Sequence, residues 1–157
     1  MLKLLVLGGS LGARALNDIV PRALALLEPT QRPQVLHQSG SRQIDALRAN
    51  YAAAAVQADL TPFIEDTARA FAEADLVICR AGATTLAEIA AAGRPAILVP
   101  FPWAADDHQR LNAEAVVAVG GAMMIRDADL TGHALASHVA ALAGDRERRR
   151  RECHARR

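Results

Sequence analysis

A run of small residues after a short apolar segment forms the clearest candidate site in the sequence. The segment Leu76–Cys79 is continuously apolar, and its length suits a strand that is covered on both faces. It is followed by Arg80-Ala81-Gly82-Ala83, in which Gly and Ala leave room for the backbone to turn closely around a ligand. Thr85 and Glu88 then have the spacing of a capping box, which predicts that a helix begins here with its amide N–H groups pointing out of the turn. Because α/β sheets bind ligands where a strand ends and a helix begins, we predict a nucleotide site here.

A second glycine-rich turn lies near the start of the chain. Gly8-Gly9-Ser10-Leu11-Gly12-Ala13 separates a predicted strand at residues 4–7 from a predicted helix at residues 14–27. Backbone N–H groups in such a turn can hold phosphate oxygens, helped by the partial positive charge of the helix N-terminus. Ser10 and the later His37-Gln38 do not fit the dinucleotide-binding fingerprint, and the turn lacks the Gly-Lys-Ser/Thr of a Walker loop. It is therefore either a phosphate loop of another kind or a turn that only packs helix on strand.

Strand and helix signals alternate along the whole chain with short links between them. Strands are predicted at residues 4–7, 34–38, 55–58, 76–79, 96–99 and 122–125. Helices are predicted at residues 14–27, 41–50, 66–74, 85–92, 108–119 and 131–143, with Ser41 and Thr131 as N-caps and Gly93 as a stop. This alternation predicts a single α/β domain with a doubly wound, parallel, six-stranded, Rossmann-like sheet.

The segments that follow these strands carry most of the polar, glycine and aromatic residues. In a parallel sheet all six strand ends face the same crevice. We therefore expect one site assembled from the ends of all six strands: 8–12, 37–40, 62–64, 80–85, 100–109 and 125–127.

Composition narrows the class of protein. The 157 residues are 52% hydrophobic but only 3% aromatic, which suits an aliphatic α/β core and argues against a single-stranded nucleic-acid platform. The net charge is +1, yet residues 146–157 hold seven Arg against two Glu, so the first 145 residues sum to about −4. Cys79 and Cys153 form no metal spacing and no disulfide framework, which suits a reducing cytoplasm. We expect neither a membrane span nor a cleaved leader.

Taken together and in order, these motifs resemble the MurG family of bacterial transferases. The resemblance covers nearly the whole chain. It rests on the glycine turn with Asn17, on His37-Gln38-Ser39-Gly40, on Pro62-Phe63-Ile64, on Arg80 to Thr85 with Glu88, and on Asp106-Asp107-His108-Gln109 with Asn112-Ala113. The family transfers N-acetylglucosamine from UDP-GlcNAc to undecaprenyl-pyrophosphoryl-MurNAc-pentapeptide, which converts lipid I to lipid II in peptidoglycan synthesis. The resemblance implies the C-terminal, donor-binding half of a GT-B enzyme over residues 1–157, with the N-terminal acceptor half absent and an Arg-rich tail at residues 145–157.

The resemblance also implies roles for individual residues. Ser10, Gly12 and Ala13 would hold the diphosphate of the donor. Ile64 would read the uracil through its backbone, with Phe63 beside it. The remaining residues implied to contact the donor are Arg80, Ala83, Thr84, Glu88, His108 and Gln109.

Some of these roles have a structural alternative. Glu88 would accept hydrogen bonds from the ribose, but it is also the capping-box partner of Thr85. Arg80 would offset diphosphate charge, or it would belong to a structural ion pair. His108 and Gln109 would contact the sugar hydroxyls, where many relatives have two amides. His37 is either a ligand contact or a satisfied structural histidine.

The resemblance implies an inverting displacement in which helix N-termini stabilise the charge that grows on the departing diphosphate. No catalytic residue is expected in this chain, because the base would come from the N-terminal half, and neither a metal nor a cofactor is expected. The chain alone would have little turnover. Its expected partners are UDP-GlcNAc, lipid I through the other half, and an anionic membrane surface, at the cytoplasmic face of the plasma membrane. A donor subunit of a two-chain transferase and a non-catalytic nucleotide-binding module remain alternatives.

Overall fold

The computed structural model describes residues 2–9, 13–102, 108–120 and 122–144. Its centre is one six-stranded sheet in which every pair of neighbouring strands is parallel. The strand order is β3-β2-β1-β4-β5-β6, so the chain starts in the middle of the sheet and winds outward in both directions. The strands are β1 (Lys3–Leu7), β2 (Gln34–Gln38), β3 (Asp59–Thr61), β4 (Leu76–Cys79), β5 (Ala96–Leu98) and β6 (Met123–Met124).

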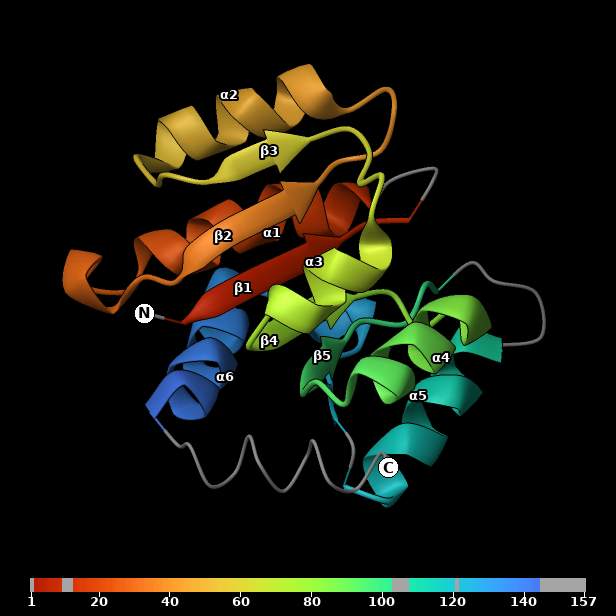
Figure 1. The fold of residues 1–157 in the computed structure, drawn as a ribbon. Helices are drawn as coiled ribbons and strands as arrows, with labels where there is room; N and C mark the ends of the chain where they lie inside the picture. The colour runs from red at the N-terminus through yellow and green to blue at the C-terminus, as the bar shows by residue number, and fades with distance from the viewer. Residues whose placement is uncertain (1, 10–12, 103–107, 121, 145–157) are drawn as a thin grey trace.

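Helices cover both faces of this sheet, which gives three layers (Figure 1). One helical layer contains α1 (Arg14–Ala25), α2 (Ile44–Ala54) and α6 (Gly132–Gly144), with α1 packed between the other two. The other layer contains α3 (Thr67–Glu73), α4 (Ala83–Ala92) and α5 (His108–Ala118). The doubly wound parallel sheet predicted from the alternating signals is thus confirmed. Two 3-10 turns, η1 (Pro29–Gln31) and η3 (Asp127–Asp129), complete the described elements.

The core consists of two apolar clusters, one on each face of the sheet. One joins β1, β4 and β5 to α1 and α6, and the other joins the same strands to α3, α4 and α5. All four residues of β4 are at most 1% exposed, as expected for a strand buried on both faces. The continuous apolar run from Leu76 to Cys79 therefore predicted this strand with its observed bounds.

Several helix ends follow their local signals. The Asp66 carboxylate accepts from the Arg69 amide at 3.0 Å at the start of α3, and the Thr131 hydroxyl accepts from the Ala134 amide at 3.1 Å at the start of α6. Gly93 closes α4 in the left-handed conformation, with φ 64°. The predicted N-cap at Thr131 and the predicted stop at Gly93 are confirmed, because each depends on contacts within a few residues.

The predictions around the third strand are wrong. The segment 55–58 is not a strand, because Ala55 adopts a left-handed conformation with φ 55° and ends α2, and β3 begins only at Asp59. Helix α2 starts at Ile44 with Gln43 as its N-cap residue, so Ser41 does not cap it, and it runs to Ala54 rather than Asn50. The alanine-rich stretch continues the helix because alanine has the highest helix propensity.

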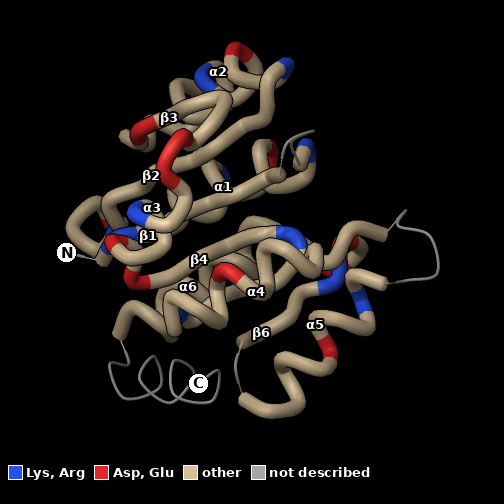
Figure 2. The backbone as a smooth tube through the Cα atoms, turned by 45° about the vertical axis from the view of Figure 1, so that its right-hand side comes forward, with Lys and Arg blue, Asp and Glu red and all other residues tan. Residues whose placement is uncertain are grey.

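Basic and acidic residues are interspersed over the described helices and loops (Figure 2). The Arg-rich segment 145–157 lies outside the described residues. Among the helices that the structure describes, none combines the length and the apolar character needed to cross a bilayer.

Candidate functional site

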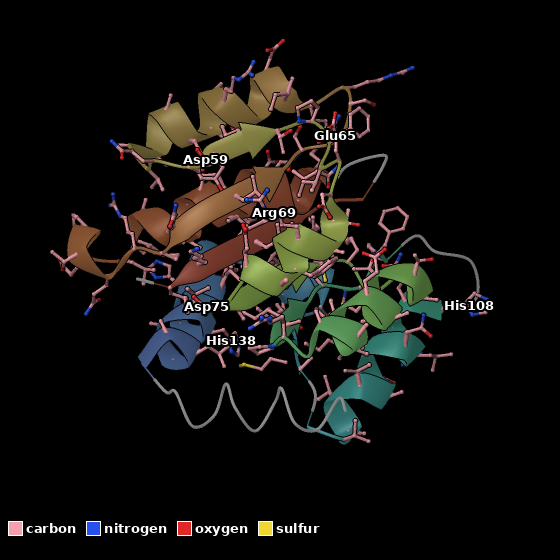
Figure 3. The ribbon with its side chains drawn as sticks, viewed as in Figure 1. Asp59, Glu65, Arg69, Asp75, His108 and His138 are labelled. Atoms are coloured by element: carbon pink, nitrogen blue, oxygen red, sulfur yellow. The ribbon has the colours of Figure 1, made fainter. Side chains whose placement is uncertain are left out.

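A cavity of about 620 Å³ opens at the edge of the sheet where the strands end. Figure 3 shows Glu65 and His108, which follow β3 and β5, toward that edge, whereas Asp59 and Asp75, at the beginnings of β3 and β4, lie toward the other. Residues at the ends of β1 to β5 and after them line the cavity: Leu7, Gly8, Gly9, Gln38, Phe63, Ile64, Thr67, Cys79, Arg80, Gly82, Thr84, Thr85, Glu88, Phe101 and Gln109. Five of the six predicted strand ends therefore contribute to one site.

The N-terminus of α4 forms one wall of the cavity. The first helical hydrogen bond of α4 runs from the Leu86 amide to the Gly82 carbonyl at 3.0 Å, so the preceding amides of the first turn have no partner within the helix. The N-cap residue is Gly82, which has no side chain that could accept from them. The predicted capping box is therefore wrong: Thr85 and Glu88 lie inside the helix, and both line the cavity.

Gly8 and Gly9, at the start of the glycine turn after β1, form the neighbouring wall. Gly9 has φ +83°, in the left-handed region, which favours glycine at this position. Helix α1 begins after it with Ala13 as the N-cap residue, again without a side-chain cap. Ala13 itself is buried and does not line the cavity. Ser10 and Gly12, both predicted to hold the diphosphate, lie outside the described residues.

The loop after β3 forms the opposite side. Phe63 is 53% exposed and lines the cavity, while Ile64 packs partly against the core. The Thr61 hydroxyl donates to the Phe63 carbonyl at 2.6 Å, which fixes the backbone just before Ile64. The predicted uracil-reading pair is thus at the cavity.

Arg80 has both a cavity-facing position and an ion-pair partner. Its guanidinium lies 2.7 Å from the Asp127 carboxylate, and the two side chains are 15% and 29% exposed. Its Nη1 also donates to the carbonyls of Val99 and Pro100 at 3.4 Å, and the guanidinium lies 5.4 Å from the centre of the Phe101 ring. The predicted structural ion pair is therefore present, and Arg80 links the ends of β4, β5 and β6.

The residues predicted to contact the sugar are placed differently from one another. Gln109 lines the cavity, and its side-chain oxygen accepts from the amides of Ala81 at 3.2 Å and Phe101 at 2.9 Å. The side-chain oxygen of Gln109 thus links the turn before α4 to the loop after β5. His108 and Ala83 are exposed and do not line the cavity, although Figure 3 shows His108 on the same side of the molecule.

His37 belongs to a buried polar network behind the cavity rather than to its lining. It is fully buried; its Nδ1 lies 2.7 Å from the Tyr51 hydroxyl and its Nε2 lies 2.9 Å from Asn17 Oδ1. The Asn17 amide nitrogen donates to the Ser39 carbonyl and to Gln43, so Asn17 Oδ1 must accept from His37. His37 is therefore the neutral tautomer with its proton on Nε2, and it has a structural role.

The burial of His37 predicts a pH-dependent stability. Burial lowers the pKa of His37 from 6.5 to about 3, so between these values the unfolded chain binds a proton that the folded chain excludes. The stability that the neutral, buried His37 contributes is fully present above pH 6.5 and is lost as the pH falls toward 3. We expect the free energy of unfolding to be about 1.4 kcal/mol lower at pH 5.5 than at pH 7.5. Urea titrations at the two pH values measure the difference.

The control is a His37→Gln variant, which cannot titrate in this range. Its difference between the two pH values should be smaller than that of the parent by about 1.4 kcal/mol. An equal difference in parent and variant would show that His37 is not the group responsible.

Three residues of the cavity that were not assigned a contact with the donor also lie outside the six strand-end segments that were predicted to form the site: Leu7, Thr67 and Cys79. Six others lie inside those segments but were not assigned a contact with the donor: Gly8, Gly9, Gln38, Gly82, Thr85 and Phe101. Position at the end of a strand was therefore a better signal than residue type. Within the described part of the chain no group of three or more His, Cys, Asp or Glu side chains could hold a metal ion.

The sheet order, the helix starts at its edge and the cavity between them define a C-terminal domain of the GT-B glycosyltransferase type. The chain belongs to the glycosyltransferase family 28 C-terminal domain family, whose model matches residues 3–156. The crystal structure of Acinetobacter baumannii MurG superposes with a TM-score of 0.89 at 42% identity, over 99% of this chain and 45% of that one. The C-terminal CMP-Kdo binding domain of WaaA from the same species shares the fold, with a TM-score of 0.72 at 8% identity. The predicted resemblance to MurG is confirmed.

Curated relatives agree with this assignment. A protein of Polaromonas sp. (strain JS666) is 67% identical over 135 residues, and one of Cupriavidus necator is 59% identical over 141 residues. Both are named UDP-N-acetylglucosamine--N-acetylmuramyl-(pentapeptide) pyrophosphoryl-undecaprenol N-acetylglucosamine transferase. The matches cover 86% and 90% of this chain but only 35% and 40% of those relatives. The chain therefore corresponds to one domain of the longer transferases.

Proposed function

We propose that this chain binds UDP-GlcNAc and serves as the donor half of an enzyme that transfers N-acetylglucosamine to undecaprenyl-pyrophosphoryl-MurNAc-pentapeptide. The observation that carries the proposal is that an open helix start and a carboxylate face the same cavity. The uncapped start of α4 and the Glu88 carboxylate, one and a half turns further on, face the same cavity as Phe63 and Ile64. An open helix N-terminus attracts a diphosphate, and a carboxylate accepts hydrogen bonds from paired hydroxyls. The names of the relatives supply the sugar and the acceptor.

In this proposal the parts of the donor lie along the ends of the strands. The uracil lies against Phe63 and the backbone at Ile64, the ribose hydroxyls donate to Glu88, and the diphosphate lies at the start of α4 beside the glycine turn. Glu88 is suited to this role because it is not needed as a cap, and its carboxylate has no hydrogen-bond or ion-pair partner among the described residues. The sugar would then extend toward Gln109.

The proposed reaction is an inverting displacement at the anomeric carbon. A hydroxyl of the acceptor attacks opposite the diphosphate, the bond to the diphosphate oxygen breaks, and UDP leaves with the electron pair. The amides at the start of α4 stabilise the charge that grows on the leaving group. The base that removes the acceptor proton is supplied by the other half of the enzyme, so the chain alone has little turnover. The acceptor lipid implies work at the cytoplasmic face of the plasma membrane.

Calorimetric titration of the chain with UDP-GlcNAc, UDP and NAD tests the proposal. We expect the two uridine nucleotides to bind and NAD not to bind. In a Glu88→Gln variant, UDP should bind about tenfold more weakly, because a charge-assisted acceptor of the ribose hydroxyls becomes a neutral one.

The matched control is Glu114→Gln on α5, where Glu114 pairs with Arg110 outside the cavity lining. It should leave the affinity for UDP unchanged. Binding of NAD together with indifference to UDP would overturn the proposal, and an unchanged affinity in the Glu88→Gln variant would remove Glu88 from the site.

A further inference from the structure

The side chain of Gln38 connects two loops that lie on either side of the cavity. Its Oε1 accepts from the Gly8 amide at 3.1 Å, and its Nε2 donates to the Gly9 carbonyl at 2.9 Å. The same Nε2 donates to the Pro62 carbonyl at 3.1 Å. Both amide hydrogens are therefore used, one on the glycine turn after β1 and one on the loop after β3.

The position of Gln38 follows from the strand order. β2 lies between β3 and β1, and Gln38 is the last paired residue of β2, opposite Leu7 of β1 and Thr61 of β3. Only the middle strand of the three can reach the loops that leave both neighbours. Gln38 is 6% exposed, so its bonds are largely shielded from water.

Backbone hydrogen bonds also join the segment after β2 to the end of β3 and the loop after it, but they do not involve Gly8 or Gly9 of the glycine turn. The amides of Ser39 and Gly40 donate to the carbonyls of Thr61 and Pro62 at 2.9 and 3.2 Å, which continues the pairing of β2 with β3. Among the described residues, the side chain of Gln38 is the group that hydrogen-bonds to both loops.

We infer that Gln38 is a positioning residue that sets the separation of the glycine turn and the Phe63–Ile64 loop, so that the two ends of one nucleotide diphosphate are bound together. The inference rests on the proposed function, in which the glycine turn borders the diphosphate and the Phe63–Ile64 loop borders the base. Without Gln38, the loop after β3 keeps the hydrogen bonds of the Thr61 hydroxyl and the Gly40 amide, and the glycine turn is still attached to β1 and α1. What Gln38 adds is the fixed distance between them, which lowers the ordering cost when one ligand occupies both.

This role predicts a pattern that differs between whole and partial ligands. In a Gln38→Met variant, which keeps the length of the side chain but loses the amide, the affinity for UDP should fall about tenfold. Uridine and inorganic pyrophosphate, which each engage one loop, should bind within about twofold of the parent. NMR titrations of the chain with the three ligands measure all of these affinities.

Two further variants complete the experiment. Gln34→Met changes the same residue type at the exposed opposite end of β2, away from the cavity, and should leave all three affinities unchanged. Gln38→Asn keeps a neutral amide but is too short to reach both loops, so it should show the Gln38→Met pattern if that variant does not fold. Thermal unfolding of each variant reports whether it is folded.

Each outcome separates the inference from the proposed function. A parent chain that binds no UDP would defeat the proposed function, whereas a parent that binds UDP and a Gln38→Met variant that binds it equally well would overturn only the inference. An equal loss of pyrophosphate and UDP would overturn it too, because Gln38 would then act on the glycine turn alone. Loss of the fold in both Gln38 variants would assign Gln38 to sheet stability and would also overturn it.

Discussion

A Gly82→Leu variant should lose binding of UDP by about 100-fold or more while keeping its fold. Gly82 is the N-cap residue of α4 and lines the cavity, and its backbone, with φ −66° and ψ 147°, is one that any L-residue adopts. A Cβ built at this position meets no other atom within 4 Å, so the folded chain accommodates a side chain there. The leucine would occupy the space that the diphosphate needs beside the amides of α4. Loss of contacts worth about 2.7 kcal/mol corresponds to this change in affinity.

Calorimetry with UDP measures the loss, and thermal unfolding measures the fold. The matched control is Gly144→Leu at the end of α6, where an added Cβ also meets nothing within 4 Å and no cavity lining is involved. It should bind UDP like the parent. If Gly82→Leu binds UDP normally, the diphosphate does not lie at the start of α4, and the proposed arrangement of the donor is wrong.

An Asn17→Leu variant should lower the free energy of unfolding by about 3 kcal/mol. Asn17 is 2% exposed, and its side chain joins α1 to His37 of β2 and, through the Ser39 carbonyl and Gln43, to the segment after β2. Leucine has a similar shape but no polar atoms, so it leaves the buried His37 Nε2–H and the Ser39 carbonyl without partners. Each such group costs about 1–3 kcal/mol. Urea denaturation at pH 7.5, where His37 is neutral in both states, measures the difference.

Asn50→Leu is the control on the facing helix. The Asn50 side chain is only partly buried and donates to the Asn17 carbonyl and the Asp18 carboxylate, where water can take its place. Its cost should stay below about 1 kcal/mol. Equal stability of Asn17→Leu and the parent would mean that the network does not contribute to holding α1 against the sheet.

Much of the fold could be predicted because its signals are local. The apolar run of β4, the Thr131 hydroxyl before α6 and the left-handed Gly93 after α4 each act through neighbouring residues, and each was predicted correctly. The predicted third strand, at residues 55–58, was wrong because the alanine-rich segment before it has helix propensity. No change in the apolar pattern marks the end of α2 at Ala55. The predicted capping box was also wrong, because α4 begins with Ala83 and Thr85 therefore lies too far into the helix to cap it.

The candidate site was less predictable, because most of its contacts join residues that are far apart in the sequence. Nothing near Arg80 indicates that its carboxylate partner is Asp127, 47 residues later, and nothing near His37 indicates that Tyr51 and Asn17 satisfy both of its ring nitrogens. Nothing near Gln38 indicates its partners either, because its hydrogen bonds to the loops after β1 and β3 exist only when β2 lies between those strands.

The sequence by itself thus determined the alternation of strands and helices, the parallel sheet and the edge at which a ligand would bind, because periodicity, caps and glycine turns act over a few residues. The tertiary structure alone decided which polar side chains are structural, such as His37 and Asn17, and which face the cavity, such as Glu88 and Gln109. The physical reason is that a side chain's partners and its burial depend on which strands become neighbours, and the strand order is a property of the packed sheet rather than of any single segment.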